Sequence, residues 1–126
     1  MLPAEYRMRR AQEFQRTVRH GRRVAGRLLV VHVARDAAAG RAVKVGFVVS
    51  KAVGGAVVRN TVRRRLRHLM RERLARLPGG TEVVVRARPG AVGARREALA
   101  AELDDALDRA LDRARDRAPD RAGSAP

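Results

Sequence analysis

Apolar residues recur at intervals of three and four positions in three stretches of the chain, which is the spacing of an α-helix with one side against a core. These stretches are residues 8–20, 59–76 and 95–113. Gly21 follows the first stretch, a Pro-Gly-Gly break at residues 78–80 follows the second, and the leucine repeat of the third stops at Leu111. The pattern therefore predicts three helices, each with one apolar side.

Three shorter, valine-rich runs predict strands, because each is too short to form a helix in its context. They are residues 28–35, 43–50 and 81–88. The segment 36–40 is a turn candidate, so we expect the first two strands to pair as a hairpin. A helix separates the second strand from the third, which favours a crossover that places the third strand parallel to an earlier one.

The end of the chain repeats in fours, as LDRA, LDRA, RDRA and PDRA from Leu107 onward. Each Arg–Asp pair on such a helix stabilises it by only about 0.2–0.5 kcal/mol. No leucine follows Leu111, and Pro119 ends any helix. We therefore predict one domain over residues 1–114 and a disordered, charged tail over residues 115–126.

Arginine dominates the helix predicted at residues 59–76, which has eight arginines and one acidic residue. Four arginines recur every fourth residue beside the apolar side and form a row: Arg59, Arg63, Arg67 and Arg71. Asn60 and Arg64 lie further round the helix. Such a row is about 18 Å long, and like charges four residues apart repel one another. A polyanion lying along the helix would relieve that repulsion, so we predict contact with nucleic acid. A solvated basic face is the alternative.

The formal charge of the chain, +16, is unevenly distributed. Residues 1–94 contain 22 basic and 5 acidic residues, a net +17, whereas residues 95–126 contain 7 and 8, a net −1. Nearly all the basic residues are arginines, whose planar group donates paired hydrogen bonds to phosphate. The basic helix has no Trp or Phe on its apolar side, which argues against a membrane-surface helix. Nucleic acid, and no membrane, is therefore the expected partner.

The chain has no cysteine, which excludes disulfides, thiolate metal sites and a cysteine nucleophile. No segment approaches the roughly 20 apolar residues of a membrane span. The N-terminal sequence lacks the apolar stretch of a secretory signal. Together these features favour a cytoplasmic location.

Acidic residues and histidines are too scattered to predict an active site. The acidic residues before position 95 are Glu5, Glu13, Asp36, Glu72 and Glu82. None of them has the spacing of metal ligands, and the three histidines fall on three different predicted elements. We expect no catalytic residue and no metal site in the protein. A histidine pair brought together by the fold is the alternative.

Candidates for stacking on RNA bases are few, because the chain has only three aromatic residues, Tyr6, Phe14 and Phe47. Phe14 and His32 are the best candidates for stacking, and core packing is the alternative for each. The glycine pair at residues 54–55 lies between a predicted strand and a predicted helix. It either leaves N–H groups open to phosphate or forms a plain turn.

Several short motifs occur in a fixed order along the chain. They are Glu13-Phe14-Gln15, His20-Gly21, residues 45–51 (VGFVVSK), Gly54, Ala56-Val57, Arg59-Asn60, Arg63-Arg64, Arg67 and residues 86–89 (RARP). In this order they resemble the protein subunit of bacterial ribonuclease P, over roughly residues 7–112. The resemblance implies an α+β fold, a compact α/β sandwich in α-β-β-β-α-β-α order similar to ribosomal protein S5 domain 2. It further implies a left-handed βαβ crossover and a fourth strand in the region 34–44.

The same resemblance implies a protein cofactor of a ribozyme. An RNA subunit with its bound Mg²⁺ would remove the 5′ leader of precursor tRNA, and the protein alone would bind no cofactor. The expected partners are the catalytic RNA and precursor tRNA, with no obligate protein partner. A structural RNA-binding protein of the ribosome or of another RNA particle is the alternative that charge and size support.

The resemblance also implies sites by position. The expected contacts with the catalytic RNA are Arg59, Asn60, Arg63, Arg64, Arg67 and Arg71. The expected leader-binding cleft comprises Phe14, Val18, Val30, His32 and Lys51. Further basic contacts are expected from Arg9, Arg10 and Arg16. Thr61 stands where arginine is common in the family, and Val18 and His32 stand where aromatic residues are common, so leader stacking is expected to be weaker.

Overall fold

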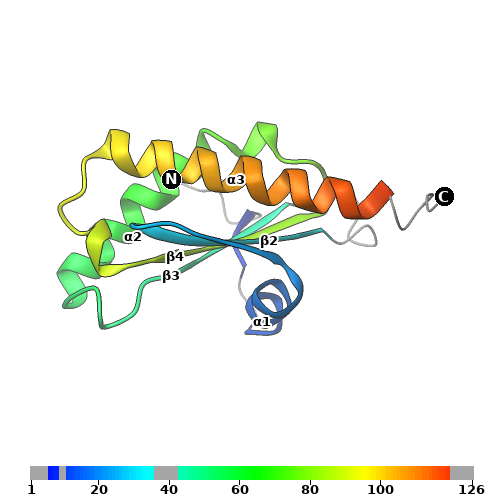
Figure 1. Cartoon of the computed structure of the whole chain (residues 1–126). Coiled ribbons are helices and arrows are strands. Elements are labelled where there is room, and N and C mark those ends of the chain that lie inside the picture. The colour runs from blue at the N-terminus through cyan, green and yellow to red at the C-terminus, as the bar shows by residue number, and fades with distance from the viewer. Residues whose placement is uncertain (1–5, 9–10, 36–42, 120–126) are drawn as a thin grey trace.

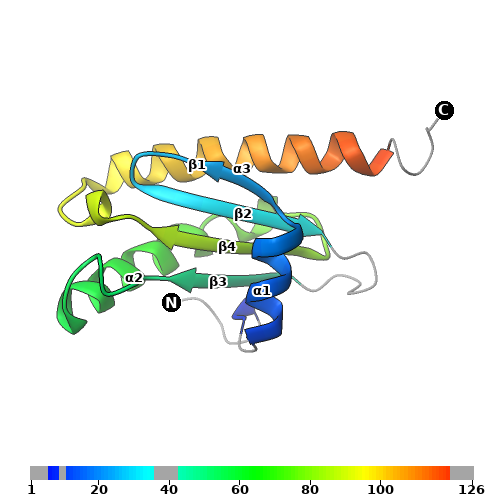
Figure 2. The same cartoon turned by 60° about the horizontal axis from the view of Figure 1, so that its bottom comes forward.

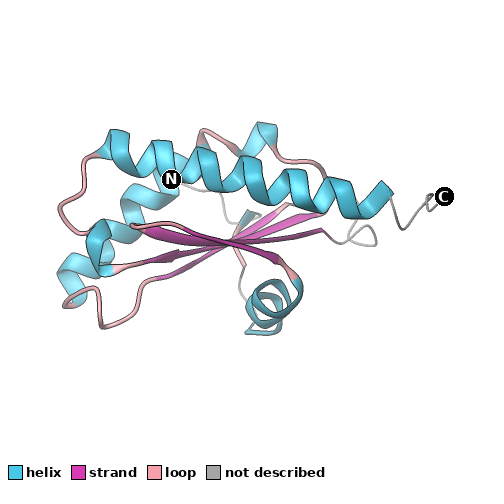
Figure 3. Ribbon diagram, viewed as in Figure 1, coloured by secondary structure: helices cyan, strands magenta, loops and turns pink. Residues whose placement is uncertain are grey.

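A sheet of four strands separates one helix from the other two. The computed structural model of the chain describes residues 6–8, 11–35 and 43–119, with side chains as far as Leu111. In Figures 1 and 3, α1 (Ala11–His20) lies on one face of the sheet and α3 (Arg96–Pro119) runs along the other. The buried residues of α2 (Ala56–Arg71) belong to the same core cluster as those of α3. This layering confirms the predicted α+β class.

The strands are β1 (Arg22–Ala25), β2 (Leu29–Arg35), β3 (Lys44–Val48) and β4 (Thr81–Ala87). Figure 2 shows their order across the sheet, β1-β2-β4-β3. β2 is antiparallel to β1 and to β4, whereas β3 and β4 are parallel. Because α2 connects β3 to β4, the predicted parallel crossover is confirmed. Its left-handed sense and the likeness to ribosomal protein S5 stay predictions.

The central strand explains why the sequence at residues 83–85 is a run of valines rather than an alternation. β4 lies between β2 and β3 and has helices on both of its faces, so Val83, Val84 and Val85 are all fully buried. Val83 and Val85 point into the main core with Leu66 of α2 and other residues of α2 and α3. Val84 points to the face that α1 covers, as the alternation of strand side chains requires.

The sheet differs from two predictions. The strands β2 and β3 do not form a hairpin, because β4 lies between them. The fourth strand of the described sheet is β1, which pairs with β2 through a short loop, and residues 36–42 of the region 34–44, where it was expected, lie outside the described residues. The four residues of β1 include two arginines and only one buried side chain, Val24, so its apolar pattern is too short to be recognised.

Helix ends also differ from the predictions. The first helix begins at Ala11 rather than at Met8, whose backbone N–H instead donates to Val45 O at 2.9 Å. The arginine helix begins earlier, at Ala56, and ends at Arg71, followed by the separate 3₁₀ turn η3 (Leu74–Arg76). A second such turn, η4 (Pro89–Ala91), precedes α3.

The C-terminal helix is longer than predicted. α3 continues to Pro119 and so includes residues 115–119, which the sequence assigned to the tail. Alanine and arginine are strong helix formers, and this composition lets the backbone remain helical beyond the last leucine. Residues 120–126, the remainder of the predicted tail, lie outside the described residues.

Candidate nucleic-acid interface

The helix α2 has one apolar and one cationic side. Its buried residues are Val62, Leu66, Leu69 and Met70. Its polar side chains line a hollow of about 240 Å³, and the lining residues are Asn60, Arg63, Arg64, Arg67 and His68. Because the apolar side is fixed in the core, these polar groups are held together on one surface, which we call the α2 surface.

Arginines on the α2 surface are crowded by like charge. Burial, Arg7 and Arg63 together lower the pKa of Arg67, which still keeps its charge at neutral pH. Arg59 Nε is buried and has no hydrogen-bond partner among the described residues. The Arg63 guanidinium donates to Asn60 Oδ1 at 2.9 Å, which fixes its direction. A phosphodiester backbone would supply both the negative charge and the acceptors that this surface lacks.

Thr61 and Arg71 lie on α2 outside the lining of the hollow. The Thr61 hydroxyl donates to Val57 O within the helix at 3.0 Å, so it is turned to the backbone rather than to a ligand. Arg71, at the last position of α2, is exposed. The structure therefore brings four of the six predicted helix residues together around the hollow, Asn60, Arg63, Arg64 and Arg67, while Arg59 lies one turn before Arg63 and Arg71 lies at the end of the helix.

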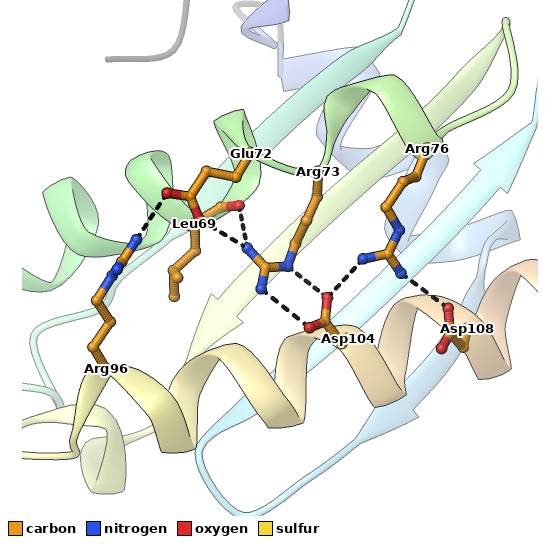
Figure 4. Close-up of polar contacts among 7 residues, drawn as sticks. All are labelled: Leu69, Glu72, Arg73, Arg76, Arg96, Asp104 and Asp108. Carbon is orange, nitrogen blue, oxygen red and sulfur yellow. Dashed lines mark hydrogen bonds and ion pairs between the residues drawn. The ribbon is translucent and has the colours of Figure 1, made fainter.

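A different set of arginines joins α2 and η3 to α3, as Figure 4 shows. Arg73 is almost buried, with 11% of its side chain exposed. Its Nε donates to Asp104 Oδ1 at 2.5 Å, its Nη2 to Asp104 Oδ2 at 3.1 Å and its Nη1 to Leu69 O at 2.8 Å. These hydrogen bonds lower the pKa of Asp104 and raise that of Arg73. Arg73 is thus a structural residue.

Two more arginines take part in this contact between α2, η3 and α3, which we call the α2–α3 seam. Arg76 donates to Asp104 at 3.1 Å and to Asp108 at 3.2 Å, and Arg96 donates to Glu72 at 2.9 Å (Figure 4). These arginines have carboxylates as partners, whereas the α2 surface collects cations. The chain therefore separates arginines that hold the fold from arginines that are available to a polyanion.

The α1 side of the sheet holds three of the predicted leader-binding residues, Phe14, Val30 and His32. His32 is paired in register with Arg23 of β1 and Val84 of β4, and Val84 is in turn paired with Gly46 of β3. These side chains form one row across the face that α1 covers. The Phe14 ring lies against Gly46 so closely that a Cβ there would clash with it. Glycine at this position therefore lets α1 approach the sheet.

The next row of the same face lies further from Phe14. It pairs Val30 with Ala25 on one side and with Arg86 on the other, and Arg86 is paired with Val48. Val30 is buried, whereas Ala25 and Arg86 are exposed. We call the two rows together with Phe14 and Val18 the α1 face. Lys51 is exposed in the turn after β3.

His32 is the one predicted leader-binding residue with a titratable ring. It is buried, at 5% exposure, and its Nδ1 has no hydrogen-bond partner among the described residues. Burial, followed by the charges of Arg23 and Arg86, lowers its pKa from the usual value of 6.5. The imidazole is therefore neutral at pH 7, and the two arginines dominate the charge of its surroundings.

This lowered pKa predicts a loss of folding stability in weak acid. Below pH 6.5 the unfolded chain binds a proton at His32 more readily than the folded chain does, so the free energy of unfolding falls as the pH decreases through that range. We expect urea unfolding between pH 7.5 and 5.5 to show a smaller decrease for His32→Gln than for the wild type. His20→Gln, at an exposed position, is the matched control and should behave as the wild type. Equal pH dependence in wild type and His32→Gln would contradict the prediction.

Of the three further basic contacts that the sequence predicts, the structure describes only Arg16. Arg9 and Arg10 are not among the described residues. Arg16 forms an ion pair with Glu82, a buried carboxylate of β4. Sequence reasoning missed Arg23 and Arg86, since only the strand register places them beside His32.

The glycine pair forms the start of α2. Gly54 has a φ of +155°, which favours glycine, and Gly55 is the N-cap, without a side-chain hydrogen bond.

Among the described residues, no three His, Asp or Glu side chains converge as a metal site. Within the same part of the chain, no helix is both long enough and apolar enough to span a membrane.

Comparison with known proteins shows which family shares this sequence and architecture. A family model described as Ribonuclease P matches residues 2–111. The ribonuclease P protein component of Streptomyces avermitilis is 56% identical over 113 residues, covering 84% of this chain and 92% of the relative. That of Acidothermus cellulolyticus is 50% identical over 104 residues, covering 82% and 87%.

Solved structures agree with the sequence relatives. The Staphylococcus aureus RNase P protein superposes with a TM-score of 0.74 at 28% identity, covering 83% of this chain and 94% of that one. The Thermotoga maritima RNase P protein, at 22% identity and a TM-score of 0.71, shares the fold, over 82% of this chain and 96% of that one. The chain belongs to the ribonuclease P protein family.

Proposed function

We propose that this protein is the cofactor of a catalytic RNA that removes the 5′ leader from precursor tRNA. The observation that carries the proposal is the α2 surface. There, arginines gather without a carboxylate in the lining of the hollow, whereas the arginines of the α2–α3 seam all have acidic partners. A surface of this kind supports binding to the folded catalytic RNA through its phosphates.

The α1 face is proposed to hold the single-stranded leader. Phe14 offers an aromatic ring, and Arg23 and Arg86 offer charge on either side of His32. Stacking combined with a basic track is the usual way in which proteins bind single strands. Binding there would favour precursor over mature tRNA, because only the precursor has a leader.

Hydrolysis itself is assigned to the RNA subunit with its Mg²⁺. The protein is proposed to lower the Mg²⁺ requirement, since its cations neutralise phosphates that metal ions otherwise screen. Precursor tRNA, the RNA subunit and this chain would then act together in the bacterial cytoplasm.

Reconstitution at low Mg²⁺ tests this function. Adding the protein to its RNA subunit should restore cleavage of precursor tRNA at the leader junction. An unchanged rate would contradict the proposal. Co-sedimentation with ribosomes and no effect on leader removal would instead favour a structural RNA-binding role, which charge and size alone support.

A further inference from the structure

Glu82 is a buried carboxylate in the middle of the sheet. It is 3% exposed and is paired in register with Ala34 of β2 and Lys44 of β3. Because side chains alternate along a strand, Glu82 points to the same side as Val84, the side that α1 covers. A charged group at such a position needs a specific partner, since burial of an unpaired carboxylate is strongly unfavourable.

Arg16 of α1 supplies that partner. Its Nε donates to Glu82 Oε1 at 3.2 Å, and its Nη2 donates to Glu82 Oε2. The guanidinium reaches the carboxylate from the edge of the helix, with 48% of the Arg16 side chain exposed against 4% for Glu82. Two parallel hydrogen bonds between planar groups fix direction as well as distance. This pair therefore restrains how α1 is rotated over the sheet.

Apart from the contact of Phe14 with Gly46, few side chains of α1 are buried against the sheet. All residues of α1 are described, and Thr17 is the only one that is fully buried. Phe14 and Val18, which flank Arg16 along the helix, are half-buried and are the residues that α1 contributes to the α1 face. A turn of the helix about its axis would move both side chains relative to His32 and Gly46.

We propose that Arg16 and Glu82 form a positioning pair that sets the orientation of α1, and with it the geometry in which Phe14 and Val18 meet the RNA leader. The inference rests on the proposed leader-binding role of the α1 face. Arg16 was expected from sequence to be a basic contact with RNA. In this assignment it acts through Glu82, and its effect on RNA is indirect.

The test is the double substitution Arg16→Met/Glu82→Gln in the reconstituted complex with the RNA subunit. It removes both charges together, so no buried carboxylate is left unpaired and the chain can fold, which thermal unfolding would verify. We expect the affinity for precursor tRNA to fall roughly tenfold, equivalent to the loss of one stacked base. Affinity for mature tRNA and for the RNA subunit should stay unchanged.

Two further variants separate positioning from direct contact. Arg19→Met removes a charge from an exposed position of the same helix and should leave the preference for precursor unchanged. Arg16→Lys keeps a cation near Glu82 and should retain part of the preference. If the pair served only folding stability, the ratio of precursor to mature tRNA affinity would keep its wild-type value in the double variant. Arg16→Lys would then have no lost preference to restore.

Three results would overturn the inference. One is a double variant that prefers precursor as strongly as the wild type. Another is an equal loss for both tRNAs with the slope of log affinity against log salt reduced by about 0.7–0.9, the signature of a lost phosphate contact. In both cases the wild type still prefers precursor, so the proposed function stands. A wild-type complex without any such preference would remove the proposed leader role and the positioning pair together.

Discussion

Replacing Arg59, Arg63, Arg64 and Arg67 with alanine should flatten the salt dependence of binding to the catalytic RNA by about 3 units in the slope of log affinity against log salt. Each arginine that neutralises a phosphate contributes roughly 0.7–0.9 units, because binding releases the counterions condensed there. The apolar side of α2 is untouched by these substitutions, so the helix should stay in the core. Filter binding over a salt series measures the slope.

The matched control removes the same charge elsewhere. The variant with alanine at four exposed positions outside α2 changes Arg19, Arg27, Arg95 and Arg109. It should leave the slope close to that of the wild type, because these residues lie off the α2 surface. If both quadruple variants lose the same slope, net charge rather than the α2 surface governs binding.

Phe14→Ala should weaken binding of precursor tRNA by about 1–3 kcal/mol relative to mature tRNA, the usual contribution of one base stacked on an aromatic ring. The ring lies over Gly46, on the side of the sheet that also presents His32. Parallel titrations of the reconstituted complex with precursor and mature tRNA give the difference directly.

Packing and stacking by Phe14 must be separated. Phe14→Leu retains an apolar group over Gly46 but no aromatic face, so it should preserve folding stability and still lose most of the preference for precursor. If Phe14→Ala weakens both substrates equally, or if Phe14→Leu binds precursor as the wild type does, the ring acts through packing alone.

Local sequence patterns were sufficient to predict the helices and strands whose apolar residues recur at a regular spacing. The basic helix was predicted because its apolar positions recur at helical spacing, and it is buried along that stripe. The parallel crossover followed from the order of strand, helix and strand. The strand β1 was missed because four residues with a single buried side chain contain too little pattern.

Contacts between distant segments could not be predicted from local patterns. Asp104 and Asp108 belong to a helix that was predicted from the spacing of its leucines alone, yet they accept hydrogen bonds from Arg76, which is 28 and 32 residues away in the sequence. Glu82 was one of several scattered acids until the fold placed it beneath Arg16, 66 residues away. In each case the partner is set by strand register or helix packing, which sequence spacing does not specify.

Register also decides the composition of the α1 face. Phe14, Val30 and His32 were expected there, and the structure brings all three to the same side of the sheet. Arg23 and Arg86 join them because β1 and β4 flank β2 in antiparallel register. A prediction that paired β2 with β3 could not have found either arginine.

The most direct test of the division of labour between protein and RNA is single-turnover cleavage of precursor tRNA by each component alone and by both together. The account predicts no leader removal by the purified protein free of RNA. It predicts slow cleavage by the RNA subunit at high Mg²⁺, and fast cleavage at the same bond by the complex at low Mg²⁺. Leader removal by the protein alone would contradict it.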